Sequence, residues 1–175
     1  DDQLIGAAYI FKRDGISWTQ QQKLSLIDGV SLDNFGISVA IEGNTAIVGA
    51  HLDNDTKGAV YIYVRSGETT WTLQQIITAS DGVANEEFGY SVAISGDYLI
   101  VGSPLNDEKG DNSGSSYIYV RNGATWSEQT KLVASDGVTN DRFGYSVDIS
   151  GDTAIIGALW DDDEGVDSGS AYMFI

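Results

Sequence analysis

Two acidic motifs recur along the chain, and both could hold cations. The first is a run of three Asp, Asn or Glu residues, found at Asp53-Asn54-Asp55, Asn106-Asp107-Glu108 and Asp161-Asp162-Asp163. The second reads D-G-V-x-x-acid-x-F-G and begins at Asp28, Asp81 and Asp136. Closely packed carboxylates repel one another, and calcium relieves that repulsion through oxygen ligands from irregular loops. We therefore expect calcium at the first motif, with the candidate ligands Asp53, Asp55, Asp107, Asp161, Asp163 and Asp167.

A second interpretation of the same loops needs no metal. Asp and Asn side chains often bond to their own backbone and form turns, and an Asp before Gly is a common turn former. The spacing does not match the twelve-residue calcium loop of helix-loop-helix proteins. The best candidate for a site is the third loop, at Asp161, Asp163 and Asp167, and for the D-G-V motif a turn is the favoured interpretation.

Few other residues could carry chemistry. The chain has one histidine, His51, and no cysteine, so histidine-assisted nucleophiles and thiolate zinc sites lack their usual partners. Carboxylate pairs could serve a glycosidase, but here they recur in every repeat, so we expect no enzyme activity. Trp160 breaks the repeat beside Asp161. It could stack on a sugar or another ligand, or it could pack against the neighbouring repeat.

These loops are part of a threefold repeat. Phe35-Gly36, Phe88-Gly89 and Phe143-Gly144 are 53 and 55 residues apart, and Trp18, Trp71 and Trp126 keep the same spacing. In the second repeat we predict four strands, at 88–94, 98–101, 116–120 and 126–132, from alternating or continuous apolar residues between Gly turns. Four short antiparallel strands per repeat of this length predict a blade of a β-propeller.

The predicted fold is all-β, a β-propeller of four-stranded antiparallel blades. A partial blade with strands three and four covers 1–34, whole blades cover 35–87 and 88–142, and a partial blade with strands one to three covers 143–175. About three blades cannot close a ring alone. We expect either a homo-oligomer or, as the favoured interpretation, part of a longer propeller. Alternating turns would place both acidic motifs, and most of the 26 acidic residues, on one face.

The net charge of −17 limits the partners. Nucleic acid is excluded as a partner, because its binding depends on neutralising phosphates with Lys and Arg. No apolar stretch approaches the roughly 20 residues of a spanning helix, so we expect no membrane insertion. The acidity suits a soluble protein that binds cations or a basic partner.

The repeated strings FGISVAIEGNTAIVGA, FGYSVAISGDYLIVGS and FGYSVDISGDTAIIGA, with an acidic loop and W-x-x-x-Q, resemble the FG-GAP repeat. That repeat builds integrin α-subunit propellers and many bacterial surface and secreted proteins. The resemblance implies a propeller fold and an extracellular or cell-surface location. The family's D-x-D-x-D-G calcium loop lies in the hairpin between strands one and two. Here those hairpins are only Glu42-Gly43-Asn44, Ser95-Gly96-Asp97 and Ser150-Gly151-Asp152, so that site cannot be carried over.

The functional hypothesis is a non-enzymatic extracellular binding or adhesion module. Its acidic face would bind a protein or glycan ligand, and calcium is the candidate cofactor. Two alternatives stay open: a structural scaffold or oligomeric spacer without a ligand, and an accessory domain of a polysaccharide-active enzyme.

Overall fold

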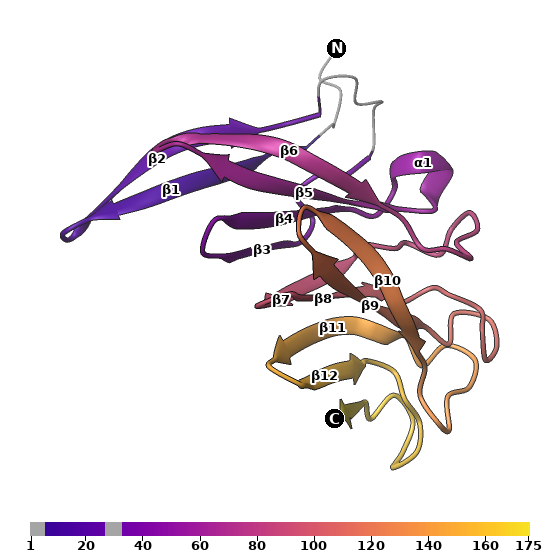
Figure 1. Ribbon diagram of the computed structural model, residues 1–175. Coiled ribbons are helices and arrows are strands. Elements are labelled where there is room, and N and C mark those ends of the chain that lie inside the picture. Colours follow the sequence, from indigo (N-terminus) through magenta and orange to yellow (C-terminus); the bar gives the residue numbers. More distant parts are fainter. Residues whose placement is uncertain (1–5, 27–32) are drawn as a thin grey trace.

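The computed structural model describes residues 6–26 and 33–175, which form antiparallel sheets in which the strands lie in chain order (Figure 1). Blade 1 holds β1 (Ala8–Asp14) and β2 (Ser17–Leu24). Blade 2 holds β3 (Val39–Glu42), β4 (Thr45–Ala50), β5 (Ala59–Ser66) and β6 (Thr70–Ile77). Blade 3 holds β7 (Ser91–Ser95), β8 (Tyr98–Ser103), β9 (Ser115–Asn122) and β10 (Thr125–Leu132). Blade 4 holds β11 (Phe143–Ser150), β12 (Thr153–Ala158) and β13 (Ser170–Phe174).

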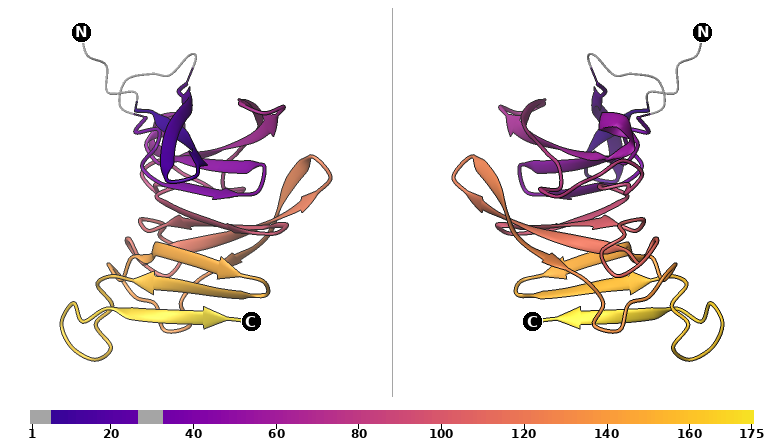
Figure 2. Two further views of the ribbon diagram at one scale, coloured as in Figure 1. Left: turned by 90° about the vertical axis from the view of Figure 1, so that its left-hand side faces the viewer. Right: turned by 90° about the vertical axis from the view of Figure 1, so that its right-hand side faces the viewer.

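The sheets follow one another like the blades of a propeller, which confirms the predicted fold class. The first strands β3, β7 and β11 lie side by side, whereas the outer hairpins β5–β6 and β9–β10 splay apart (Figure 2). The result is a partial propeller whose ring this chain alone does not close. Among the described residues, no helix is long and apolar enough to span a membrane.

Short turns and long loops lie at opposite ends of the blades. The turns between strands one and two are two-residue hairpins, Gly43-Asn44, Gly96-Asp97 and Gly151-Asp152. The glycine opens each turn with φ between +56° and +58°, a left-handed conformation that glycine adopts more easily than residues with a Cβ. The loops between strands two and three gather at the other end, with the helical turn α1 (Asp53–Thr56) among them (Figure 1). The sequence did not predict α1, in which Asn54 and Asp55 are left-handed.

The hydrophobic core lies between the blades. At the junction of blades 2 and 3, Ile47 and Ile62 pack with Phe88, Leu99 and Trp126. Similar clusters fill the other two junctions. Burying such a side chain contributes about 1.5–3 kcal/mol, so each junction stabilises the fold. In blades 2 and 3, strands two and three are buried on both faces because a blade packs on each side of them.

Each junction is closed by a Phe-Gly pair that docks on the preceding blade. Phe88 N donates to Lys57 O at 3.0 Å, and Phe143 N donates to Ser113 O at 3.0 Å. The phenylalanine therefore precedes the strand in blade 3, where β7 begins at Ser91 and not at Phe88 as predicted. The positive φ of the following glycine, +93° at Gly89, turns the chain away from the dock.

Serine and glycine complete the dock. The Ser38 hydroxyl donates to Gly89 O at 2.7 Å, and the Ser91 hydroxyl donates to Gly144 O at 2.8 Å. A Cβ on Gly102 would lie 2.0 Å from Gly144 O, far inside van der Waals contact. The F-G-x-S string and the glycine after strand two are therefore two halves of one contact between blades.

A glutamine clasp joins the outer strands. The Gln22 side chain accepts from Trp71 N at 2.7 Å and donates to Trp71 O at 2.9 Å. Gln75 makes the same pair of bonds with Trp126, each 2.8 Å long. These contacts give the W-x-x-x-Q string its physical meaning, because the glutamine of one blade holds the tryptophan backbone of the next.

Replacing Gly102 by alanine will destabilise the chain, whereas the matched change Gly157→Ala will not. At Gly102 the new methyl meets the carbonyl of the docked Gly144, while at Gly157 it meets only the movable Ser146 hydroxyl at 2.4 Å. We expect Gly102→Ala to lower the free energy of unfolding by about 1–3 kcal/mol. Urea titration of both variants measures the difference, and equal losses at the two glycines would contradict the docking account.

Candidate functional site

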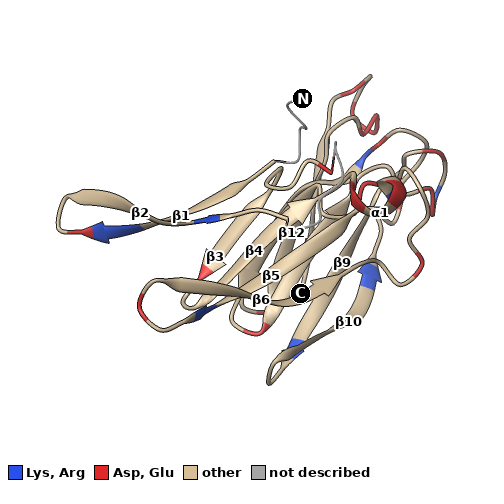
Figure 3. Ribbon diagram, turned by 90° about the horizontal axis from the view of Figure 1, so that it is seen from above, with Lys and Arg blue, Asp and Glu red and all other residues tan. Residues whose placement is uncertain are grey.

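The acidic residues concentrate on the end of the blades that carries the long loops, which we call the loop face. It consists of the loops that join strands two and three and of the loops that join successive blades. Figure 3 shows Asp and Glu gathered around α1 and these loops, with fewer acids in the hairpin turns at the opposite end. Both acidic motifs therefore share one face in the described part of the chain, and Asp28 lies outside the described residues.

Blade 3 neutralises its acids with a lysine. The Lys131 ammonium, on β10, lies 2.7 Å from Asp81 Oδ2 and 3.0 Å from Glu108 Oε2. The Tyr117 hydroxyl donates to Asp81 Oδ1 at 2.9 Å. Burial alone would raise the pKa of Asp81, but the hydrogen bonds from Lys131 and Tyr117 and the ammonium charge outweigh it and hold that pKa below its usual range.

Blade 4 brings three carboxylates together at the corresponding place. Oxygen atoms of Asp136, Asp161 and Asp163 all lie within 4.8 Å of one another. Asp161 is only 2 % exposed, and the Tyr172 hydroxyl oxygen lies 2.6 Å from Asp161 Oδ2 and 2.8 Å from Asp136 Oδ1. Asp136 and Asp163 are exposed. We call this group the carboxylate cluster.

The charges in the carboxylate cluster affect one another. The negative charge of Asp161, followed by that of Asp136, raises the pKa of Asp163. Burial would also raise the pKa of Asp161, but hydrogen bonds from Tyr172, from Asp163 N and from Ser170 outweigh it and lower that pKa. Among the described residues, no Lys or Arg forms an ion pair with the cluster. The geometry thus concentrates negative charge at a place where blade 3 has an ammonium.

The other proposed ligands lie outside this cluster. Asp53 accepts a hydrogen bond from the Tyr61 hydroxyl at 2.5 Å, and the neighbouring Asp55 has a left-handed backbone. Asp107 Oδ1 accepts from Asn112 N at 2.7 Å, and Asp167 N donates to Asp162 Oδ1 at 2.7 Å. In the loops of blades 3 and 4, the carboxylates of Asp107 and Asp162 therefore form the turns, and Asp167 contributes its backbone N–H. A metal role for these four residues stays a prediction.

From the sequence alone, Asp136 is a weaker candidate for a metal ligand than Asp161 and Asp163. Its D-G-V motif predicts a turn. The structure contains that turn, in which Gly137 N donates a hydrogen bond to Ala134 O. The antiparallel order of the strands predicts that these residues meet, because it places the loop before a blade next to the loop between its second and third strands. The carboxylate cluster combines Asp161 and Asp163 of one motif with Asp136 of the other.

Trp160 faces an arginine. The Arg142 guanidinium lies 3.9 Å from the centre of the Trp160 ring, a cation–π contact. Trp160 N also donates to Asp141 O at 3.2 Å, so the residue is held by the loop that leads into its own blade. The ring is 39 % exposed, and ligand contact there stays a prediction.

His51 is a core residue. It is buried, its ring contacts the edge of Tyr90, and its Nδ1 has no hydrogen-bond partner among the described residues. Burial lowers the pKa of the imidazole, which keeps it neutral near pH 7. No acid or nucleophile bonds to it among the described residues.

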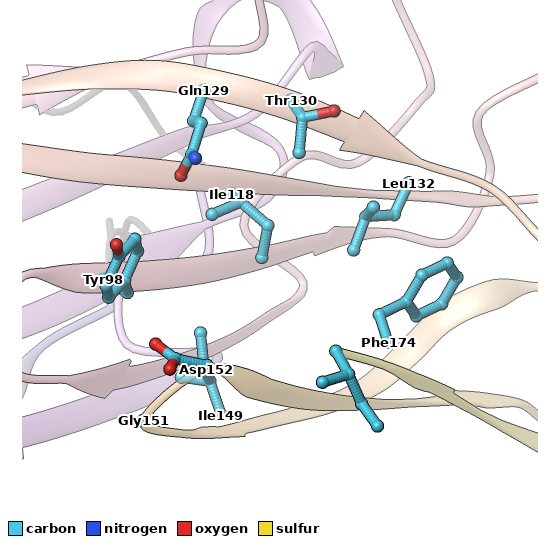
Figure 4. Close-up of a pocket in the computed structure, with 10 residues that line it drawn as sticks. Tyr98, Ile118, Gln129, Thr130, Leu132, Ile149, Gly151, Asp152 and Phe174 are labelled. Carbon is cyan, nitrogen blue, oxygen red and sulfur yellow. The ribbon is translucent and has the colours of Figure 1, made fainter.

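A hollow between blades 3 and 4 is a packing feature. It is lined mainly by apolar side chains of both blades, with the carboxylate of Asp152 at its lower side (Figure 4). Its members Ile118 and Leu132 correspond to Ile62 and Ile77, which pack around Trp126 one junction earlier. The hollow therefore has the place and the lining of a tryptophan site of a fourth strand.

Replacing Lys131 by methionine will weaken folding in a pH-dependent way. The pKa of Asp81 is lowered in the folded chain, so its ion pair stabilises above the unfolded pKa of about 3.9 and loses that effect as the pH falls through the folded value. We expect a loss of about 1 kcal/mol at pH 7 for this partly exposed pair. Urea titrations at pH 7 and at about pH 3 should show the loss shrinking in acid, and Lys109→Met is the control. A loss that does not change with pH would contradict an electrostatic role for Lys131.

A comparison with known protein families shows which family the three repeats match. A family model described as FG-GAP repeat matches residues 18–63, 71–119 and 126–174. A search of curated proteins found no match. Repeats of this family form β-propeller-like modules that often take part in binding or adhesion, and they are typical of extracellular or surface proteins. Since the matches cover most of the sequence, the chain belongs to the FG-GAP repeat family.

Proposed function

We propose that the chain is a non-enzymatic extracellular binding or adhesion module whose loop face docks a protein or glycan ligand, with calcium at the carboxylate cluster. The observation that carries this proposal is the meeting of Asp136, Asp161 and Asp163 at one point of the loop face. The family supports a binding role in general terms. The cation and the ligand are the specific parts of the proposal.

Comparison of the acidic residues with those of blade 3 supports a cation at the cluster. Blade 3 places an ammonium between Asp81 and Glu108, and blade 4 has Asp136 and Asp163 at the two corresponding positions. Where blade 3 has the neutral Asn106, blade 4 has Asp161. The cluster thus has one acidic residue more than the corresponding place in blade 3, where two acidic residues already share an ammonium.

The dimensions of the cluster suit calcium. Calcium binds oxygen at about 2.3–2.6 Å, so two ligands of one ion lie at most about 5 Å apart. The three carboxylates meet this limit, since their oxygens lie within 4.8 Å of one another. Magnesium demands a tighter octahedral shell and keeps its water, so we expect this loop site to prefer calcium.

Exposure of the cluster supports a role in ligand binding. Asp136 and Asp163 face solvent, so a bound ion would keep coordination positions open to a carboxylate or hydroxyl of a partner. Trp160 is the residue before Asp161, and its partly exposed ring offers an apolar surface of the kind that sugar faces pack against. An ion beside an aromatic ring suits a glycan or a protein with exposed acidic groups.

Removing two charges from the cluster will abolish the response to calcium. We expect calcium at about 100 times its Kd to raise the Tm of the chain by about 5–10 °C relative to EDTA, because a ligand of the folded state stabilises by mass action. Asp161→Asn with Asp163→Asn should remove this rise. The variant should fold, because Asn already occupies the place of Asp161 in blade 3.

The matched control removes two charges from the opposite end of the blades. Asp14→Asn with Asp152→Asn changes the net charge equally, so it should keep the response to calcium. Thermal melts at fixed ionic strength in calcium, magnesium and EDTA make the comparison. Equal rises with both cations, or an unchanged rise in the cluster variant, would mean screening of the overall charge and would exclude the site.

Ligand binding will depend on the same two residues. On a glycan array read in calcium and in EDTA, we expect the chain to bind a subset of glycans only with calcium. The cluster variant should lose those signals, and the Asp14→Asn, Asp152→Asn control should keep them. Glycan binding that survives both EDTA and the cluster variant would place the ligand elsewhere.

A further inference from the structure

The two loops that form the carboxylate cluster also bring Arg142 and Trp160 together. Arg142 ends the loop that carries Asp136, and Trp160 directly precedes Asp161. We propose that the Arg142 guanidinium binds the carboxylate of an acidic sugar residue, so that the ligand of the loop face is a glycan with isolated carboxylates. This inference rests on the proposed function and names the class of its ligand.

The Arg142 guanidinium has no hydrogen-bond partner in the described part of the chain. Its Nε is buried and bonds to no described residue, so the fold bears a cost to hold the side chain in this place. The two Nη groups are neither bonded to a described residue nor buried, and they can therefore donate to a ligand. A carboxylate fits such a pair of donors, because its two oxygens can accept two parallel hydrogen bonds.

Two other arginines show how the chain satisfies a guanidinium elsewhere. Arg65 and Arg121 also lie over tryptophan rings, at 5.9 and 5.3 Å from the ring centres. Arg65 Nε donates to Asn44 Oδ1 at 2.9 Å, and Arg121 Nε donates to Asp97 Oδ1 at 2.8 Å. Arg142 lies closer to its tryptophan, at 3.9 Å, but it lacks the acceptor that the other two have.

Glu87 does not neutralise Arg142. It occupies the corresponding position of blade 3, one residue before the Phe-Gly pair. Burial raises the pKa of Glu87, and the charge of Arg142, which would lower that pKa, does not outweigh burial. Among the described residues the two side chains form no ion pair. The guanidinium thus remains available to a carboxylate from outside the chain.

The surroundings of Arg142 suit a sugar. The Trp160 ring is partly exposed and offers an apolar surface to the C–H groups of a pyranose. The rings of Tyr90 and Tyr145 lie 5.0 Å apart, and the charge of Arg142 acts on Tyr90, so hydroxyl groups lie near the guanidinium. An acidic sugar combines a carboxylate, hydroxyls and an apolar face, whereas an acidic side chain of a protein offers the carboxylate alone.

Exposure is a property of this position in the blade. Trp160 corresponds to Leu52 in blade 2 and to Leu105 in blade 3. Both leucines are partly exposed although another blade packs beside theirs. The tryptophan therefore replaces a smaller apolar side chain at a place on the loop face that a ligand can reach.

The overall charge limits the kind of acidic glycan. A net charge of −17 repels a polymer with a dense negative charge. One planar guanidinium pairs with one carboxylate, and its fixed fork suits that group better than a point charge does. We therefore expect a glycan in which single acidic residues stand among neutral sugars.

The test titrates methyl glucuronide, with its neutral methyl ester as the matched control, into the isotope-labelled chain. EDTA and a fixed ionic strength make the outcome independent of calcium. In NMR spectra of the arginine Nε–H groups, we expect the Arg142 signal to shift with a Kd of about 10 mM for the acid. Equal shifts with the ester, or no shift up to about 100 mM acid, would overturn the proposal. A calcium response without these shifts would leave the proposed function standing.

Variants show whether Arg142 makes the contact. Arg142→Gln should fold, because the corresponding positions hold Asn34 and Glu87. We expect it to weaken binding of the glucuronide, followed through the Tyr145 amide, at least about tenfold. Arg65→Gln removes the same charge from another arginine–tryptophan pair and should keep the wild-type affinity. Wild-type affinity in Arg142→Gln, or an equal loss in both variants, would contradict a specific contact.

An acidic peptide is the rival ligand. N-acetylglutamate amide carries a side-chain carboxylate without a sugar ring, and it is titrated under the same conditions. We expect it to bind more weakly than methyl glucuronide, because it lacks the hydroxyls and the apolar face. Equal or tighter binding would assign the guanidinium to a protein carboxylate and overturn the choice of a glycan.

Discussion

Close approach of two backbones at each blade junction is the constraint on which the rest of the structure depends. A carbonyl of the incoming Phe-Gly pair occupies the space that a Cβ on Gly49 or Gly102 would need, 2.0 Å away in both cases. This approach lets serine cap the incoming carbonyl and lets phenylalanine reach the core. Since every cluster of buried residues spans a junction, blade packing, core and repeat length all follow from this contact.

The same constraint explains why acidity collects on one face. The hairpin end consists of turns of two or three residues that have little room for extra side chains, whereas the loop end carries segments of variable length. Acids there are tolerated because loops supply backbone N–H groups, as at Asp107 and Asp162, or a hydroxyl, as at Asp53. Although the net charge is −17, local hydrogen bonds stabilise these carboxylates, so they do not need Lys or Arg side chains in the core.

Sequence patterns predicted the architecture better than the site. Repeat length, alternation and Gly turns are local signals, and they gave the strand order and the blade packing correctly. The position of Phe88 outside β7 and the left-handed turn at Asn54 and Asp55 were missed, because docking and loop length set them. Among the acids, a turn former such as Asp107 and a clustered residue such as Asp161 share one motif. They stand at different positions of it, because Asp162 takes the turn-forming place of Asp107 in blade 4, and the cluster also needs Asp136 from the neighbouring loop.

In blade 3, one residue of the fourth strand, Lys131, neutralises acidic residues of the loop face. Lys23 and Lys131 occupy this position in blades 1 and 3, and each ammonium lies over the tyrosine of its own third strand, at 5.9 and 5.4 Å. In blade 2 the position holds Ile76, which offers no charge to Asp53, and that carboxylate accepts from Tyr61 instead. A lysine there supplies a built-in cation, because a charge at 3 Å from a carboxylate outweighs the cost of partial burial. In blade 3 this single side chain therefore joins the loop that leads into the blade, through Asp81, to the loop between its second and third strands, through Glu108.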